Sequence, residues 1–187
     1  MKIVLAVTGA SGAILARETL RQLKAAGASV HLVISHGAER TIPLELGPAA
    51  LDALRGVADV VHAVDDMAAP IASGSYRVDA MAITPCSMRT LAAIAHGFGD
   101  NLITRAADVM LKERRRLVIA PREAPLTEAH LNSMLALTRM GAIVAPPVPP
   151  FYADLKTIDD VAREIAARTL SWLGLDPGDA LTRWQGG

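Results

Sequence analysis

Residues 2–13, KIVLAVTGASGA, decide the fold of this chain. Residues 3–7 are all apolar, which is typical of a strand covered on both faces. A glycine-rich turn over residues 9–12 follows at once, and a helical pattern begins directly after it. A buried strand, a tight turn and a helix in this order predict the first unit of a doubly wound α/β sheet.

The same alternation continues through the 187 residues. After the first strand, the pattern predicts strands at 29–35, 59–63, 78–84, 117–120 and 142–145, with Pro85 ending the fourth strand of the chain. It predicts helices at 12–26, 36–56 (broken by Pro43, Gly47 and Pro48), 88–96, 101–114, 127–140 and 157–173. We expect one α/β domain over 1–187, with a three-layer, doubly wound, mainly parallel sheet, and with helix 157–173 and tail 174–187 packing at the active site or a subunit interface.

Composition excludes several function classes. Nineteen basic and nineteen acidic side chains give a formal net charge of zero, and aromatic residues make up only 3%, so no nucleic-acid surface is expected. The only cysteine, Cys86, rules out an intrachain disulfide, and the histidines show no metal-ligand spacing, so no metal site is expected. The longest charge-free stretch, 140–153, contains four prolines and cannot be a membrane-spanning helix. We expect a cytoplasmic protein with no membrane contact.

Ligands in such a sheet bind beyond the carboxyl ends of the strands. Those ends fall at 8–12, 35–36, 84–90 and 121–125. The first matches neither the dinucleotide pattern GxGxxG nor the phosphate loop GxxxxGK[ST], so a ligand and a simple tight turn stay equally open there. The loop around Ser87 opens a helix with two hydroxyls and Arg89, which suits either a phosphate or ordinary capping.

Two helices bring charged residues to one face. On helix 101–114, Arg105, Asp108 and Lys112 are three, four and seven residues apart, which fits a site or a solvated ion pair. On helix 157–173, Arg168 falls within the apolar stripe formed by Ile158, Val161, Ile165 and Trp172. A buried arginine requires a carboxylate, a subunit interface or a bound phosphate.

Two carboxylates follow strands or bends in the same region. Glu123 comes after a buried strand, and Glu45 follows a proline-marked bend. Each is a candidate general acid or base, and the alternative for each is a salt bridge or a helix cap.

Seven short motifs occur in an order that resembles the UbiX-type flavin prenyltransferases, formerly described as aromatic acid decarboxylases. They are Thr8-Gly-Ala-Ser-Gly-Ala13, Ala72-Ser-Gly-Ser75, Pro85-Cys-Ser87, Asn101-Leu-Ile-Thr-Arg-Ala-Ala-Asp108, Leu111-Lys-Glu-Arg-Arg115, Pro121-Arg-Glu-Ala-Pro125 and Pro150-Phe-Tyr152. Each is modest alone, and together they cover the chain from the first strand to the last helix.

The resemblance implies a Rossmann-like or flavodoxin-like, FMN-binding domain that assembles into a homododecamer. It implies transfer of a dimethylallyl group from dimethylallyl monophosphate to N5 and C6 of reduced FMN, without a metal. The prenylated FMN would then serve a UbiD-type decarboxylase. A cysteine-decarboxylase-type flavoprotein and a flavin carrier without catalytic activity are the alternatives; the former's Pro-Ala-Ser-Ala-Asn-Thr motif is missing here.

The resemblance also assigns residues. It implies FMN contacts at Gly9, Ala10, Ser11, Ser35, Ser87, Met88, Arg89, Thr90 and Arg122. It implies donor binding at Lys112, Tyr152 and Arg168, and catalytic roles for Ser11, Glu45, Arg105, Lys112 and Glu123. Glu123 would protonate the departing phosphate, and Ser11 with Glu45 would relay the proton lost from C6. Met67 stands where some members have a tryptophan that walls the prenyl site, which leaves Tyr76 and Trp184 as the nearby aromatic candidates.

Overall fold

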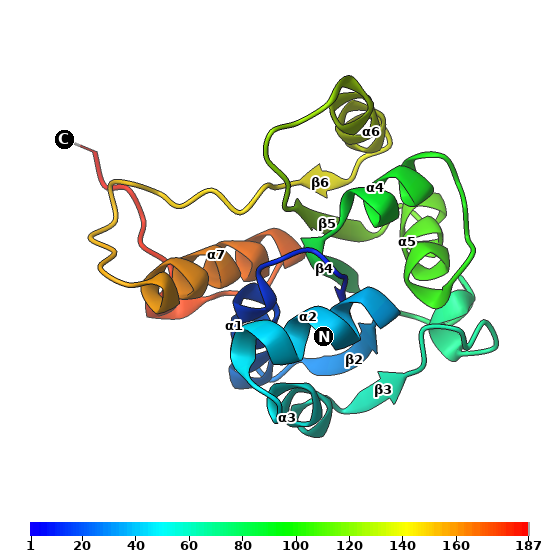
Figure 1. The fold of residues 1–187 in the computed structure, drawn as a ribbon, viewed down its shortest axis with the longest axis horizontal. Helices are drawn as coiled ribbons and strands as arrows, with labels where there is room; N and C mark the ends of the chain where they lie inside the picture. Colours follow the sequence, from blue (N-terminus) through cyan, green and yellow to red (C-terminus); the bar gives the residue numbers. More distant parts are fainter. Residues whose placement is uncertain (187) are drawn as a thin grey trace.

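Six parallel strands form one sheet in the computed structural model, which describes residues 1–186. The strands are β1 Lys2–Val7, β2 Ser29–Ile34, β3 Val60–His62, β4 Ala80–Cys86, β5 Arg116–Pro121 and β6 Ile143–Val144. Their spatial order is β3-β2-β1-β4-β5-β6, so the chain winds outward in both directions from β1 and β4 (Figure 1). This order is that of a doubly wound, Rossmann-like sheet, and the predicted fold class is confirmed.

Helices cover both faces of the sheet, as a buried parallel sheet requires (Figure 1). One face packs against the helices α1 Ala13–Ala25, α2 His36–Leu46, α3 Ala50–Val57 and α7 Ile158–Leu173. The other packs against α4 Met88–Ala95, α5 Leu102–Lys112, α6 Glu128–Arg139 and the short helix η1 Pro70–Ala72. A second short helix, η2 Gly178–Ala180, lies in the C-terminal tail.

Strand β4 runs two residues beyond the predicted end. It continues through Pro85 to Cys86, with an irregular register against β5 between Ile83 and Cys86. Proline lacks the N–H that a regular ladder needs, but an irregularity in the ladder removes that need. The carbonyl of Pro85 instead accepts a hydrogen bond from the Thr8 backbone N–H at 3.2 Å.

The apolar stripe predicted on the last helix is only half-buried: Val161, Ile165 and Trp172 are partly covered, whereas the fully buried face is a different one. Helix α7 packs on α1 through a different face, where most of the buried side chains are small: Ala162, Ala166, Ala167, Thr169, Leu170 and Leu173. Ile158 is 75% exposed, and Arg168 is exposed as well. Small side chains let two helix backbones approach closely, so Ala162, Ala166 and Ala167 pack inward, joined by Leu170 and Leu173 near the end of the helix.

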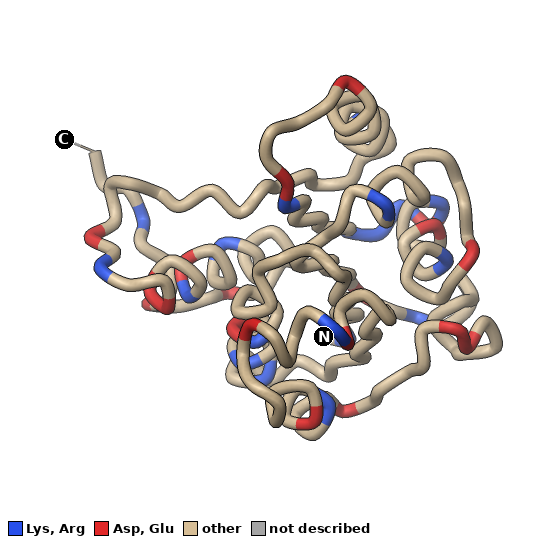
Figure 2. The backbone as a smooth tube through the Cα atoms, in the orientation of Figure 1, with Lys and Arg blue, Asp and Glu red and all other residues tan. Residues whose placement is uncertain are grey.

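Basic and acidic residues are interspersed along the backbone, as Figure 2 shows. Among residues 1–186, no helix has both the length and the apolarity to cross a membrane.

The turn after β1 touches the start of α2. A Cβ added to Gly9 would lie 3.0 Å from the backbone Cα and carbonyl carbon of Gly37, closer than packed carbon atoms allow. Both glycines are therefore needed for the close approach of these two backbones.

We expect Gly9→Ala to lower the free energy of unfolding by about 1–3 kcal/mol, because the added methyl group forces two backbones apart. Gly56→Ala is the matched control, since a Cβ there, in helix α3, meets nothing within 4 Å. It should stabilise the protein by about 0.5–1 kcal/mol through helix propensity. Urea unfolding at one protein concentration measures both, and equal effects would contradict the close-contact account.

Candidate active site

The loops after β1 and β4 are tied together by one buried hydroxyl. Thr8 Oγ1 donates to the Pro85 carbonyl at 2.9 Å and accepts from the Ser87 backbone N–H at 2.7 Å. Thr8 is 1% exposed, so neither hydrogen bond competes with water. The β1 turn and the start of α4 therefore keep a fixed spacing at the carboxyl edge of the sheet.

Arg122, directly after β5, ties the third loop to the first. Its backbone N–H donates to the Cys86 carbonyl at 3.1 Å, and its side-chain Nε donates to the Ser11 carbonyl at 2.9 Å. The carboxyl ends of β1, β4 and β5 thus form one continuous edge. Cys86 itself is fully buried and burial raises the pKa of its thiol, so it is a packing residue rather than a nucleophile.

Glu45, near the end of α2, reaches the N-terminus of α1. Its carboxylate accepts from the backbone N–H groups of Gly12 at 2.9 Å and Ala13 at 2.7 Å. Burial opposes ionisation, but hydrogen bonds from the Ser11 hydroxyl and the two N–H groups outweigh it and hold the pKa of Glu45 below its ordinary value. The anion at this helix N-terminus is therefore a side chain of the protein itself.

The start of α4 is a second helix N-terminus at the same edge. Ser87 is the N-cap; its Oγ lies 3.4 Å from the Thr90 backbone N–H and donates to Thr90 Oγ1 at 3.1 Å. The backbone N–H groups of Met88 and Arg89 have no acceptor within residues 1–186. The Arg89 side chain pairs with Asp100. These first-turn donors at α4 are directed outward at the edge where a ligand is expected.

Ser35 occupies the equivalent position after β2. It is the N-cap of α2, and its hydroxyl accepts from the Ala38 backbone N–H at 3.2 Å. Its own backbone N–H donates to the Val7 carbonyl, which places it beside the β1 turn. Gly9 and Ala10 lie in that turn, so the predicted FMN-contact residues lie along one edge of the sheet.

A second group of predicted residues lies on α5. Arg105 pairs with Asp108 at 2.8 Å and donates from Nε to the Ala72 carbonyl at 3.0 Å, which ties α5 to the end of the short helix η1. Lys112 pairs instead with Glu113 at 2.5 Å. The sequence predicts that Arg105, Asp108 and Lys112 share one helical face and form either a ligand site or a solvated ion pair. Arg105 and Asp108 do form a partly exposed ion pair.

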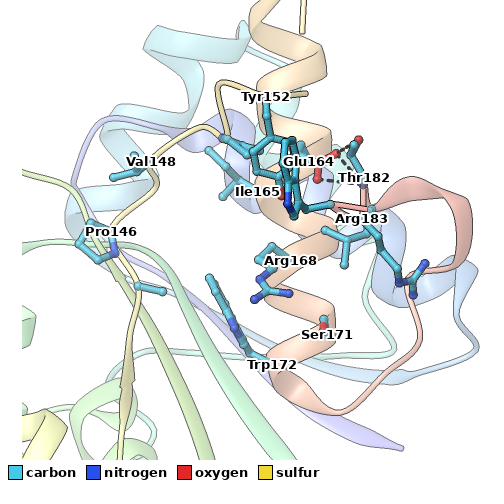
Figure 3. Close-up of a pocket in the computed structure, with 14 residues that line it drawn as sticks. Pro146, Val148, Tyr152, Glu164, Ile165, Arg168, Ser171, Trp172, Thr182 and Arg183 are labelled. Atoms are coloured by element: carbon cyan, nitrogen blue, oxygen red, sulfur yellow. Dashed lines mark hydrogen bonds between the residues drawn. The ribbon is translucent and has the colours of Figure 1, made fainter. Parts of the chain in front are cut away.

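The third group lines a cavity of about 500 Å³ between α7, the proline-rich segment after β6 and the C-terminal tail (Figure 3). Tyr152 and Arg168 both line it. The Arg168 guanidinium lies 5.2 Å from the ring centre of Trp172, and the rings of Tyr152 and Trp184 meet edge to face at 5.4 Å. Arg168 is thus an exposed cation among aromatic side chains, and the buried environment predicted for it is wrong.

The residues considered for the wall of a prenyl site lie in different places. Tyr76 accepts from Lys2 Nζ at 2.9 Å and packs edge to face on His31, away from the cavity. Met67 is an exposed loop residue. Only Trp184 of the three lines the cavity.

One chain does not bring all predicted donor residues together. Lys112 and Arg105 lie on α5, while Arg168 lies on α7, and these helices pack on opposite faces of the sheet (Figure 1). Glu123 lies in the loop after β5, where its carboxylate accepts from the Ala124 N–H at 3.0 Å.

Sequence analysis missed three residues that shape the site. Thr8 begins the first of the seven motifs, but no pattern in the sequence assigns a role to its hydroxyl. Glu164 and Thr182, which both line the cavity, look like ordinary surface residues in the sequence. Their hydrogen bond spans eighteen positions and leaves no pattern.

Comparison with known proteins decides the family. The family model described as Flavoprotein matches residues 1–170. The flavin prenyltransferase UbiX of Neisseria meningitidis serogroup B is 47% identical over 185 residues, which covers 99% of this chain and 97% of the relative. The chain belongs to the UbiX flavin prenyltransferase family. The resemblance inferred from the seven motifs is therefore confirmed.

Solved structures agree with this family. A UbiX protein in complex with FMN and dimethylallyl pyrophosphate has a TM-score of 0.96 and 49% identity, covering 100% of this chain and 98% of its own. A UbiX-like decarboxylase from Escherichia coli O157:H7, described as dodecameric and FMN-dependent, has a TM-score of 0.94 and 46% identity, with both chains fully covered. A peptidyl-cysteine decarboxylase at 18% identity and a TM-score of 0.64 shares the fold alone.

The lowered pKa of Glu45 predicts a pH-dependent contribution to stability. Its carboxylate stabilises the fold above the ordinary glutamate pKa of about 4.3, and this contribution is lost as the pH falls through the lowered value. The unfolding temperature of Glu45→Gln should therefore be lower than that of the wild type at pH 7. The difference between the two unfolding temperatures should shrink toward pH 3.

The matched control for this experiment is Glu128→Gln. Glu128 is likewise a carboxylate close to a helix N-terminus, that of α6, but it accepts no hydrogen bond within residues 1–186. If the drop in unfolding temperature caused by Glu45→Gln does not depend on pH, or equals the drop in the control, Glu45 is not an ionised cap of α1.

Proposed function

We propose that this chain transfers the dimethylallyl group of dimethylallyl monophosphate to N5 and C6 of reduced FMN. The observation that carries the proposal is the Arg168 cavity, where a cation and a tyrosine hydroxyl lie among aromatic rings. An allylic phosphate has the matching chemistry, since one end is anionic and the other is apolar. The similar UbiX structure that holds FMN and dimethylallyl pyrophosphate supports this choice of ligands.

The edge formed by the ends of β1, β2, β4 and β5 fits FMN. Gly9 and Gly37 let the turn after β1 lie close against the start of α2, the free N–H groups of Met88 and Arg89 suit a phosphate or a carbonyl oxygen, and Arg122 adds a cation. Further contacts on the same edge come from Ala10, Ser11, Ser35, Ser87 and Thr90. Reduced FMN supplies the nucleophilic N5 and C6 atoms when bound.

The donor's phosphate leaves as an anion. Arg168, the Tyr152 hydroxyl and Lys112 stabilise the charge that develops on it, and Glu123 supplies a proton to it. Arg105 orients the phosphate beside Lys112. The rings of Tyr152 and Trp184 exclude water from the allylic cation and face it with negative π-density.

Loss of the C6 proton needs a base at the FMN edge. Glu45 is held ionised by the hydrogen bonds that it accepts, and the Ser11 hydroxyl is one of their donors. Ser11 therefore passes a proton to Glu45, which makes the two a relay.

Copies of the chain complete one another's sites. Arg105 and Lys112 of one copy lie across the sheet from Arg168 of the same copy, so we place them against the cavity of a neighbouring copy. The dodecameric, FMN-dependent relative from Escherichia coli supports a homododecamer. In this assembly helix α7 and the tail after it lie at the active site.

The product is prenylated FMN, and the class of enzyme that consumes it is a UbiD-type decarboxylase. We place the protein in the cytoplasm, where reduced flavin and a thiol such as that of Cys86 persist.

Mass spectrometry of the flavin tests the proposal. The protein is incubated anaerobically with reduced FMN and dimethylallyl monophosphate, and the flavin is extracted. We expect a gain of one C5H8 unit. Unmodified FMN with the monophosphate and with the diphosphate would contradict prenyl transfer, and product from the diphosphate alone would contradict the choice of donor.

The acid role of Glu123 gives a second test. Glu123→Gln should lower turnover with dimethylallyl monophosphate by about 10²–10⁴-fold, because the leaving phosphate loses its proton source. Glu128→Gln, five residues along the chain and on α6, is the control and should keep wild-type turnover. Single-turnover absorbance of the flavin measures both, and an active Glu123→Gln variant would remove the acid role.

A further inference from the structure

A buried carboxylate on α7 holds the C-terminal tail. Glu164 is 5% exposed, and its two oxygens accept from the Thr182 backbone N–H at 3.0 and 3.2 Å. Its Oε2 also accepts from Thr182 Oγ1 at 3.0 Å (Figure 3). One residue of the tail therefore satisfies a buried carboxylate with both of its donors.

For residues 181–186 of the tail, this contact is the only hydrogen-bonded tie to the rest of the described chain. Among residues 181–186, the other hydrogen bonds run from Arg183 to Gly178 and Asp176, which belong to the same tail. The remaining anchor is Leu181, which is 9% exposed. Two positions after Thr182, Trp184 meets the ring of Tyr152. The tie at Thr182 thus decides where Trp184 lies.

The same tie decides which partner Arg168 has. Glu164 precedes Arg168 by four residues on one helix, a spacing at which glutamate and arginine ordinarily pair. No ion pair forms between them within residues 1–186, and the guanidinium lies over Trp172 instead. Thr182 takes the carboxylate and leaves Arg168 available to an anion.

We propose that Glu164 is a positioning residue for the prenyl donor. Its contact with Thr182, the tail latch, fixes Trp184 against Tyr152 and keeps the Arg168 guanidinium unpaired for the donor's phosphate. This inference rests on the proposed function, since it assigns the cavity to an allylic phosphate.

Opening the latch has a defined kinetic consequence. Without the Thr182 hydroxyl, the Glu164 carboxylate keeps only the Thr182 backbone N–H as a donor, so its Oε2 is released to pair with Arg168 and to compete with the phosphate, while the FMN edge is unchanged. Thr182→Val should therefore raise KM for dimethylallyl monophosphate about tenfold with little change in kcat, on the scale of a hydrogen bond to a charged group. Thr182→Ser keeps the hydroxyl and should restore the wild-type KM.

Two variants of Glu164 separate charge from packing. Glu164→Gln keeps an oxygen that accepts from the Thr182 N–H and removes the charge that would compete for Arg168, so KM should stay within about threefold of the wild type. Glu164→Ala removes the acceptor and the competing charge together, so its rise in KM reports loss of tail docking alone and should be smaller than that of Thr182→Val. If Glu164→Ala does not fold, the Thr182 pair still tests the proposal.

Tail docking can be measured without turnover. The chain has two tryptophans, Trp172 and Trp184. In a Trp172→Phe background, Trp184 is the only tryptophan, and its acrylamide quenching and anisotropy, excited where tyrosine does not absorb, report whether the tail is docked. Thr182→Val should increase quenching and lower anisotropy in the ligand-free protein, whereas Thr182→Ser should leave both unchanged.

The two readouts distinguish failure of the latch from failure of the function. Greater Trp184 quenching together with a raised donor KM, at unchanged FMN affinity, would support the proposal. Unchanged quenching, or unchanged KM in a turning-over enzyme, would overturn it. If the wild type forms no prenylated flavin, the function fails, and the quenching experiment alone decides whether the latch exists.

Discussion

The buried hydroxyl of Thr8 bonds to both Pro85 and Ser87, so β1 and β4 cannot separate at their carboxyl ends without leaving polar groups unsatisfied. Everything at the FMN edge depends on this spacing. The turn at Gly9 can approach a ligand because its backbone is held against Gly37, and Arg122 spans to the same turn from β5. The strand order brings these loops together, and the Thr8 hydroxyl keeps them there.

The strands and most helices could be predicted from the sequence because their signals are local. The apolar run of β1 is covered on both faces, and Thr157 with Asp160 forms the capping box that its spacing predicts. The end of β4 was predicted too early, because a proline usually ends a strand. Here the strand continues through Pro85, since the pairing with β5 is irregular between Ile83 and Cys86. The family was recognised from the order of seven short motifs. Hydrophobic periodicity and composition indicate the fold class but not the family.

The contacts that fell outside prediction are those set by three-dimensional packing. Helix α7 turns its alanines toward α1, whereas the apolar stripe chosen from the sequence is half-buried and includes the exposed Ile158. Glu45 caps a helix that begins more than thirty positions earlier, and Glu164 binds a tail residue eighteen positions later. A carboxylate on a helix has the same appearance in sequence whether it is solvated or holds another segment in place.

The central claim is that one prenylation site uses side chains from more than one copy. Lys112→Met and Arg168→Leu subunits with different tags are co-expressed, and mixed oligomers are purified through both tags. If the two residues act from different copies, random mixing leaves both intact in about one quarter of sites, and the hybrid should regain about that share of wild-type prenyl transfer. A hybrid no more active than either parent would contradict the claim.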